Sequence, residues 1–313
     1  MSDGPGLLEV RGLGIDFDTP DGVACVVDDV SFTVAPGECV ALVGESGCGK
    51  SITAKAIVGL LDHRRARVRG SMRFEGTELD PGGRGRRAVL GSRIAVVPQD
   101  PMAALNPTFP VHDQMRAVYR GVEERYDPGR ALRDVGVDDP ERILSSFPFQ
   151  LSGGLAQRVL VGMALLNAPG LVLADEPATA LDTRVQRQAL DRLRRSVDEE
   201  RMGLLLISHD LGLVRRYADR ILVMYAGHIV EEAPTDALFD RPAHPYTCAL
   251  LAALPSMDGV RIPSSIDGEL PDYTAIPEGC RFRPRCPHAL EACVDPVHLR
   301  EVGDAHRAAC VRC

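Results

Sequence analysis

The sequence predicts an α/β protein with a mostly parallel core sheet, a helical subdomain and a small cysteine-rich C-terminal extension. Three observations lead to this fold class. Short apolar segments alternate with segments of helical periodicity, residues 101–170 lack a convincing strand, and five of the nine cysteines follow residue 279. The chain is 45% apolar and 26% charged, which provides a buried core and excludes wholesale disorder.

The first hundred residues carry strand and helix signals in a clear order. Residues 30–34 alternate apolar and polar side chains, a Pro–Gly turn follows, and 39–43 is a short apolar run. This pattern predicts two strands around a turn. A helix is expected over 51–61 from its apolar spacing, and further strands are expected at 71–74 and 93–97.

The middle of the chain changes character and then returns to alternation. Between residues 101 and 170, helices are predicted near 111–126, 128–136, 140–147 and 155–168. Strands are then predicted at 171–174, 203–207 and 220–225, separated by helices near 183–200 and 210–218. Short apolar strands that alternate with helices are typical of a parallel sheet buried on both faces.

Periodicity ends after residue 254, where prolines punctuate the chain. We expect a first domain over residues 1–254, with the helical subdomain at about 101–170, and an extension over 255–313. Within this extension, 256–279 is predicted as a linker or extended arm. Residues 280–313 are predicted as a unit too small to be stable without a covalent cross-link or a bound metal.

Charge and hydropathy exclude several classes of protein. The net charge of −8 gives no general reason to expect nucleic-acid binding, and the arginines around Phe282 and between residues 64 and 93 are expected to form a solvated or partner-facing surface. No apolar stretch follows Met1, so a secretory signal is not expected. The most apolar run, 159–174, contains Asn167, Pro169 and Gly170, so it is not expected to span a membrane. Membrane contact is expected only through a partner.

A glycine-rich segment after the 39–43 strand fits the pattern G-x-x-x-x-G-K-[ST] between a strand and a helix. Its glycines let backbone N–H groups surround an anion, and the helix N-terminus adds partial positive charge. Lys50 is expected to reach the β- and γ-phosphates, Ser51 to bind Mg²⁺, and Cys48 to contribute main chain rather than sulfur. The candidate nucleotide-binding residues are Gly44, Glu45, Ser46, Gly47, Cys48, Gly49, Lys50, Ser51 and Ile52.

Two carboxylates follow the apolar run 171–174. Asp175 is a candidate for holding the metal and Glu176 for polarising the attacking water. On their own, two acids at this place could simply favour the N-terminus of the next helix. A nearby phosphate loop makes the catalytic interpretation the better one.

A third motif, Leu-Ser-Gly-Gly-Leu-Ala-Gln-Arg at 151–158, opens a helix before these acids. A Ser-Gly-Gly helix start can bind an anion, although Ser152 would also serve as an ordinary N-cap. Further matching residues are Gln99, the run Ala180, Leu181 and Asp182, and His209. Together, in this order, these motifs resemble the ATP-binding cassette (ABC) ATPases over residues from about 8 to 254.

The resemblance implies a P-loop fold with an antiparallel β subdomain beside the core sheet, and a head-to-tail dimer that encloses two ATP molecules. It implies that Ser152 and Gly154 reach the partner's nucleotide and that an aromatic side chain, for which Phe17 is the candidate, stacks on adenine. The implied catalytic residues are Glu176, His209, Lys50 and Gln99. The implied Mg²⁺ site consists of Ser51, Gln99 and Asp175.

The C-terminal part resembles the extension of oligopeptide, dipeptide and nickel importer ATPases. The resemblance rests on His-Pro-Tyr-Thr at 244–247 and on the apolar run 250–255. Separately, Leu155, where many cassettes carry Gln, resembles one of the two ATPases of peptide-type importers. The resemblance of the C-terminal part also rests on four cysteines, Cys280, Cys286, Cys293 and Cys310. Such a set could hold a [4Fe–4S] cluster, a zinc ion or nothing at all. We favour the cluster, because the paired C-x₂₋₄-C spacing of structural zinc sites is absent.

These resemblances predict the ATP-hydrolysing subunit of an importer of di- or oligopeptides or a related small solute, nickel included. The expected partners are a paralogous ATPase subunit, two membrane permease subunits and, indirectly, an extracellular solute-binding protein, with no nucleic acid. The expected location is the cytoplasmic side of the cell membrane. The alternatives are an ABC-type ATPase of a non-transport assembly or regulatory complex, a DNA-repair cassette, and a nucleotide-binding module without catalysis.

Overall fold

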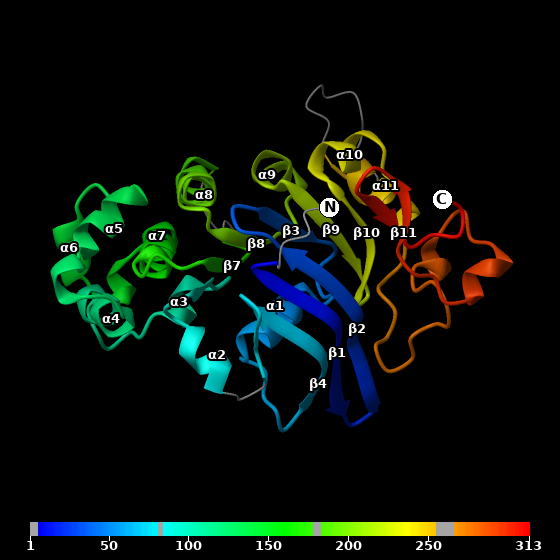
Figure 1. Cartoon of the computed structure of the whole chain (residues 1–313), viewed down its shortest axis with the longest axis horizontal. Helices are drawn as coiled ribbons and strands as arrows, with labels where there is room; N and C mark the ends of the chain where they lie inside the picture. The colour runs from blue at the N-terminus through cyan, green and yellow to red at the C-terminus, as the bar shows by residue number, and fades with distance from the viewer. Residues whose placement is uncertain (1–5, 81–83, 178–182, 255–265) are drawn as a thin grey trace.

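The computed structural model describes residues 6–80, 84–177, 183–254 and 266–313 (Figure 1). Its larger sheet has the strand order β11-β12-β10-β9-β3-β8-β7-β6. The strands from β9 to β6 pair in parallel, as the alternation of apolar strands and helices predicts. Their bounds are β3 Cys39–Val43, β6 Ile94–Val97, β7 Leu171–Asp175, β8 Gly203–Ile207 and β9 Arg220–Tyr225.

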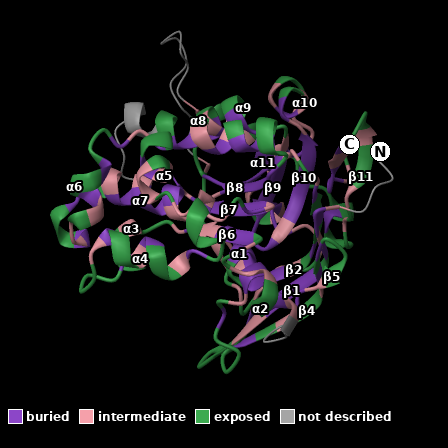
Figure 2. Cartoon of the chain, turned by 60° about the vertical axis from the view of Figure 1, so that its left-hand side comes forward, coloured by how far each residue is buried: buried purple, intermediate pink, exposed green. Residues whose placement is uncertain are grey.

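Both faces of this parallel sheet are buried, which explains why its strands are apolar throughout. In β3, Cys39 and Ala41 belong to one core cluster, while Val40 and Leu42 belong to the other. Figure 2 shows the central strands almost entirely in the colour of buried residues. Helix α1 (Lys50–Val58) packs in the second cluster, and helices α8 (Thr183–Glu200) and α9 (Leu211–Tyr217) pack in the first.

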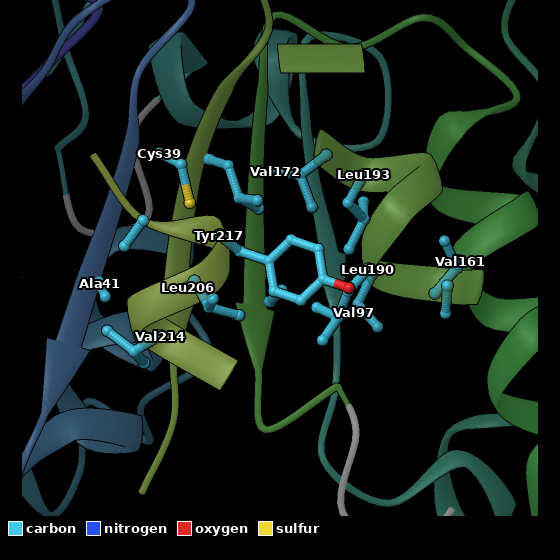
Figure 3. Packing of buried hydrophobic residues seen from close by; sticks show 14 of the residues in the cluster. Cys39, Ala41, Val97, Val161, Val172, Leu190, Leu193, Leu206, Val214 and Tyr217 are labelled. Atoms are coloured by element: carbon cyan, nitrogen blue, oxygen red, sulfur yellow. The ribbon is translucent and has the colours of Figure 1, made fainter. Parts of the chain in front are cut away.

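Tyr217 shows how the first cluster joins helices to the sheet. Its ring lies between strand side chains such as Val172 and Leu206 and the α8 residues Leu190 and Leu193 (Figure 3). The Tyr217 hydroxyl donates a hydrogen bond to Asp191 Oδ1 at 2.8 Å, so the polar end of the ring is satisfied at the edge of the core.

A second, antiparallel sheet has the order β2-β1-β4-β5, in agreement with the antiparallel β subdomain implied by the family resemblance. Its strands are β1 Leu8–Thr19, β2 Gly22–Val34, β4 Ala66–Phe74 and β5 Thr77–Glu78. The alternation at 30–34 identifies only the end of β2. Sequence periodicity does not reveal β1, because register shifts between Val10 and Leu13 and between Leu13 and Ile15 interrupt its inward-outward pattern.

Helices occupy residues 101–170 as predicted and lie at the far end of the molecule from the C-terminal segment (Figure 1). They are α3 Pro101–Ala104, α4 Val111–Val118, α5 Pro128–Asp134, α6 Pro140–Ser145 and α7 Gly153–Leu165. The expected helix over 111–126 is wrong in length. Asn167 ends α4 early, since its side chain donates to Val118 O at 2.9 Å and accepts from Arg120 N at 2.8 Å. The short helix α2 (Arg84–Val89) lies between the strands expected at 71–74 and 93–97, where the sequence analysis predicted no helix.

The C-terminal segment continues the core sheet, although the sequence suggested a linker and a separate small unit. Strand β12 (His306–Ala308) pairs with β10 (His228–Pro234) and with β11 (Arg300–Gly303). The fully buried Glu231 fastens this junction by accepting from His306 Nε2 at 2.7 Å and from the main-chain N–H groups of residues 243 and 244. Helices α10 (Thr235–Asp240) and α11 (Pro245–Ala252) precede the segment. None of the helices in the described ranges is long and apolar enough to cross a membrane.

His244 is a buried histidine next to the pairing of β10 and β12. It is 1% exposed, and its Nδ1 accepts a hydrogen bond from Tyr246 N at 3.1 Å, which caps α11. Burial lowers the pKa of His244 from 6.5 to about 4. Because the folded pKa is the lower one, the contribution of the neutral ring to stability is present above the unfolded pKa. It is lost as the pH falls from about 6.5 towards 4.

We therefore expect the free energy of unfolding of the wild type to fall by about 2 kcal/mol more than that of His244→Asn between about pH 7 and pH 5. Asparagine can still cap the helix but does not titrate in this range. Urea unfolding of both proteins at the two pH values measures the difference. Equal pH dependence in the two proteins would contradict the assignment.

Candidate functional site

The parallel sheet brings four separate chain segments to one edge. The loop at 44–49 follows β3, Gln99 lies two residues after β6, Glu176 directly follows β7, and His209 lies two residues after β8. Since these strands are parallel neighbours, their carboxyl ends meet, and the crevice beyond such an edge is where open α/β sheets bind ligands. These four segments therefore belong to one site.

The loop between β3 and α1 has the conformation that its glycines permit. Gly44, Gly47 and Gly49 all have positive φ, and a Cβ on Gly44 would lie 2.1 Å from Met224 O. Helix α1 begins at Lys50, and no side chain caps it, because Gly49 is its N-cap. The first N–H groups of α1 have no side-chain acceptor, and the positive end of the helix dipole lies at the same place. This is the physical basis of an anion site.

Lys50 is 5% exposed and is held by its own loop. Its Nζ donates to Gly44 O and to Glu45 O, both at 2.9 Å, and lies 3.8 Å from Cys48 Sγ. An ammonium group with carbonyl partners can exchange them for phosphate oxygens, which carry full negative charge. Lys50 is thus placed to bind a polyphosphate entering the loop.

Ser51 and Asp175 form the part of the site suited to a metal. The Ser51 hydroxyl donates to Asp175 Oδ1 at 2.9 Å, joining the start of α1 to the end of β7. Burial and the neighbouring Glu176 raise the pKa of Asp175, while the hydrogen bond from Ser51 and the charges of Lys55 and Lys50 act in the opposite direction. A hydroxyl and a carboxylate oxygen are the ligands that Mg²⁺ prefers, so these residues fit the ion.

Glu176 is the centre of a second group of side chains. Its Oε2 accepts from Gln99 Nε2 at 2.9 Å, and its Oε1 lies 3.0 Å from His209 Nδ1. The backbone of Glu176 has φ of +47°, a conformation that is costly for a residue with a side chain and that recurs at functional sites. Strands β6, β7 and β8 thus bring one predicted catalytic residue each to the same point.

The phosphate loop, the start of α1, Gln99 and Glu176 line one pocket of about 210 Å³. Its lining residues are Ser46, Gly47, Gly49, Lys50, Ser51, Ile52, Gln99 and Glu176. All eight are among the residues that the sequence motifs identified.

Some predicted residues are absent from this lining but adjoin it: Gly44, Glu45 and Cys48 belong to the same loop, and Asp175 and His209 contact Ser51 and Glu176. Phe17, Ser152 and Gly154 neither line the pocket nor belong to its loop. Phe17 is partly buried against the second core cluster, so its role with adenine stays a prediction. Ser152 is the N-cap of α7 and accepts from Leu155 N at 3.3 Å, and Gly154 lies in the first turn of that helix. Their role toward a partner's nucleotide also stays a prediction. The predicted run Ala180, Leu181 and Asp182 lies outside the described residues.

Sequence motifs did not reveal the residues that contact the phosphate loop from the C-terminal side. Tyr246 accepts from Glu45 N at 2.8 Å, Tyr273 donates to Gly47 O at 2.7 Å, and Arg285 binds the Glu45 carboxylate. Two signals were available: the His-Pro-Tyr-Thr motif, which contains Tyr246 and served only to indicate the family, and the arginine cluster around Phe282, which we interpreted as a solvated or partner-facing surface. For Arg285 that interpretation is wrong, since its side chain is only 6% exposed and paired within the chain.

Comparisons with known proteins agree with this geometry. Residues 27–179 match the family described as ABC transporter, and residues 230–293 match the family described as the C-terminal region of oligopeptide/dipeptide transporters. The dipeptide transport ATP-binding protein DppD of Escherichia coli (strain K12) is 40% identical over 97% of this chain and 96% of its own length. The oligopeptide transport ATP-binding protein OppD of Mycobacterium tuberculosis (strain ATCC 25618 / H37Rv) is 43% identical over 98% of this chain and 52% of its own length.

A solved structure supports the fold over most of the chain. The ATP-binding subunit of an ABC transporter superposes with a TM-score of 0.63 and 30% identity, covering 78% of this chain and 99% of that one. These matches confirm the resemblance that the motifs indicated. On the strength of relatives that align with nearly its whole length, the chain belongs to the ABC transporter family, as an ATP-binding subunit with the C-terminal region found in oligopeptide and dipeptide transporters.

Proposed function

We propose that this chain hydrolyses ATP to energise an importer of di- or oligopeptides or of a related small solute such as nickel. The convergence of the phosphate loop with Gln99, Glu176 and His209 at one sheet edge carries the proposal of ATP hydrolysis. The solute class is supported by the relatives named for dipeptide and oligopeptide transport and by the C-terminal match at 230–293.

In this proposal each residue of the site has its own role. The phosphate loop and Lys50 bind and orient the β- and γ-phosphates. Ser51, Asp175 and Gln99 would hold Mg²⁺, which when bound neutralises phosphate charge. Glu176 orients and polarises the attacking water, while Gln99 and His209 keep its carboxylate in place through the contacts described above. His209 also contacts the γ-phosphate.

A second cassette completes the site in this proposal. Ser152 and Gly154 start α7 and would bind the γ-phosphate of the nucleotide held by the partner. We propose a paralogous ATPase subunit as that partner, two membrane permease subunits as the coupled channel, and a solute-binding protein on the outside. The chain would then lie on the cytoplasmic side of the membrane, held there by the permeases.

The test is assembly and coupled turnover. Tagged protein purified from its native host in mild detergent should retain polytopic membrane proteins and a second cassette, identified by mass spectrometry. In proteoliposomes, ATP hydrolysis by that assembly should rise when a peptide-loaded binding protein is added. Recovery with soluble assembly factors alone would favour the non-transport alternative, and hydrolysis unaffected by any peptide would contradict the solute class.

We further propose that Cys280, Cys286, Cys293 and Cys310 hold a [4Fe–4S] cluster. All four are free thiols that line one cavity, and Cys293 and Cys310 are buried. The Leu290 N–H donates to Cys293 Sγ at 3.4 Å. Burial raises the pKa of the Cys280 and Cys286 thiols, and hydrogen bonds from main-chain N–H groups, Phe282 to Cys280 and His288 to Cys286, act in the opposite direction. Such hydrogen bonds stabilise a thiolate and are a feature of cluster ligation. The donor set and its surroundings therefore fit the group.

Zinc remains the alternative occupant. In the described residues, no three His, Cys, Asp or Glu side chains are gathered in a way that would hold a single metal ion. Structural zinc sites usually carry a paired C-x₂₋₄-C spacing, which is absent from the extension, whereas the ligand spacing of [4Fe–4S] clusters varies more widely. This difference in spacing supports the cluster.

The cluster proposal predicts a spectroscopic loss in a single variant. Anaerobically purified wild type should contain iron and acid-labile sulfide in equal amounts and absorb broadly in the visible range. Cys293→Ser should lose most of the iron and the absorption, because it removes one of the four ligands. Cys248→Ser, which changes an exposed cysteine of α11, is the matched control and should keep both. Stoichiometric zinc without sulfide in the wild type would contradict the cluster.

A further inference from the structure

Residues of the C-terminal extension contact the phosphate loop directly. Arg285 donates from Nη1 to Glu45 Oε2 at 2.7 Å and from Nη2 to Glu45 Oε1 at 3.0 Å. The Tyr273 hydroxyl donates to Gly47 O at 2.7 Å. Two separate segments of the extension therefore hold two residues of the loop that receives the nucleotide phosphates.

Arg285 is itself fixed by several contacts besides Glu45. Its Nε donates to Asp267 O at 2.8 Å and its Nη2 to Ile266 O at 3.1 Å. The guanidinium also stacks over the ring of Tyr225, 5.7 Å from its centroid. A planar guanidinium paired with a carboxylate by two parallel hydrogen bonds fixes both position and orientation. The Glu45 side chain thus has a rigid partner.

The main chain of Glu45 is held as well. Its N–H donates to the hydroxyl of the fully buried Tyr246 at 2.8 Å. Phe282 packs on the rings of Tyr246 and Tyr225, with centroid distances of 5.4 and 5.1 Å, and is 1% exposed. Phe282 and Arg285 both lie between Cys280 and Cys286, so a single short segment of the extension supports Glu45 from two directions.

We propose that Arg285 and Tyr273 are positioning residues of the ATP site, through which the C-terminal extension fixes the conformation of residues 45–47 and thereby sets nucleotide affinity. The inference rests on the proposed function in that the pocket must bind ATP. A glycine-rich loop left to itself loses conformational entropy when it closes on phosphates, and a loop already fixed avoids that cost. The extension supplies this preorganisation to a loop that lies more than two hundred positions away in the sequence.

The test measures binding of a fluorescent ATP analogue with Mg²⁺ to the full-length chain. Arg285→Gln should weaken affinity about tenfold, as expected for the loss of a bidentate charged contact. Arg285→Lys should be intermediate, since an ammonium cannot make the two parallel bonds. Arg283→Gln is the matched control, because it removes the same charge from the same turn and no hydrogen bond or ion pair of this side chain is found among the described residues. It should bind as the wild type does.

Two further variants separate positioning from loss of folding. Tyr273→Phe removes only the hydroxyl that bonds Gly47 O and should weaken affinity about threefold with an unchanged melting temperature. Glu45→Gln should weaken binding as Arg285→Gln does, and the double variant should be no weaker than either single one, because both remove the same contact. Iron content should stay at the wild-type level in all of them.

The outcomes distinguish this inference from the proposed function. Wild type that fails to bind the nucleotide analogue would contradict ATP binding itself. If the wild type binds, and Arg285→Gln and Tyr273→Phe bind equally well, the positioning role is overturned while the proposed function stands. Additive losses in the Glu45 and Arg285 double variant would also overturn it, since the two side chains would then act independently.

Discussion

Glu176→Gln is expected to reduce ATP turnover by at least about a hundredfold in the assembled complex, while ATP binding is retained. The carboxylate lies at the end of β7 with Gln99 and His209 on its two oxygens, so it is both fixed and placed beside the phosphate loop. Glutamine has the same shape and keeps an acceptor for Gln99, but it cannot take a proton from water. The substitution therefore removes the chemistry and leaves the binding residues intact.

Phosphate release by the purified complex measures the loss, and titration of the isolated chain with a fluorescent ATP analogue measures binding. Glu199→Gln on α8 is the control, because it makes the same chemical change at an exposed position. Turnover that is lost together with binding would indicate a structural defect instead. Undiminished turnover would remove Glu176 from the catalytic role.

The parallel part of the fold could be predicted because each of its strands has a pattern that can be recognised within a few consecutive residues. Strands β8 and β9 lie at the predicted residues 203–207 and 220–225, since each is a short apolar run bounded by helices. Both faces of these strands are buried, which produces a continuous apolar signal that needs no knowledge of partners. Strand β1, with its register shifts, lacks such a signal.

The tail could not be predicted in the same way, because its structure depends on distant contacts. Strand β12 is three residues long and forms by pairing with β10, about 75 positions earlier in the chain. Nothing in the local pattern of residues 300–308 indicates that partner. The buried Glu231 that fastens them lies in β10, which the periodicity also did not reveal.

The same distinction between local pattern and distant contact applies to the residues of the site. Motifs identified all the residues that line the pocket, because phosphate and metal chemistry restricts residue type and spacing within single loops. They did not identify Arg285, Tyr273 or Tyr246 as residues of the site. Each of them contacts the phosphate loop from a distant part of the chain, and such a contact produces no recognisable motif in the sequence. The charge of Arg285 suggested an exposed surface, and only tertiary structure shows that it is paired.

Lys50→Met is expected to weaken ATP binding by on the order of a hundredfold and to abolish turnover, because each charge-assisted hydrogen bond to a phosphate contributes ~1.5–3 kcal/mol. Methionine keeps the buried stem of this 5% exposed side chain and removes only the charged donor. The bonds from Nζ to Gly44 O and Glu45 O are lost as well, so the loop loses both its ligand and one of its own supports.

The chain offers a matched control, since Lys55 is the other lysine in the sequence and lies exposed on the same helix α1. Lys55→Met should bind ATP and turn it over as the wild type does. Binding is measured by titration with the fluorescent analogue, and thermal unfolding without nucleotide shows how much of the Lys50 effect comes from the loop itself. ATP should raise the melting temperature of the wild type and of Lys55→Met but not that of Lys50→Met. An equal rise in all three proteins would mean that Lys50 does not bind the phosphates, and the nucleotide site would have to be sought elsewhere on the sheet.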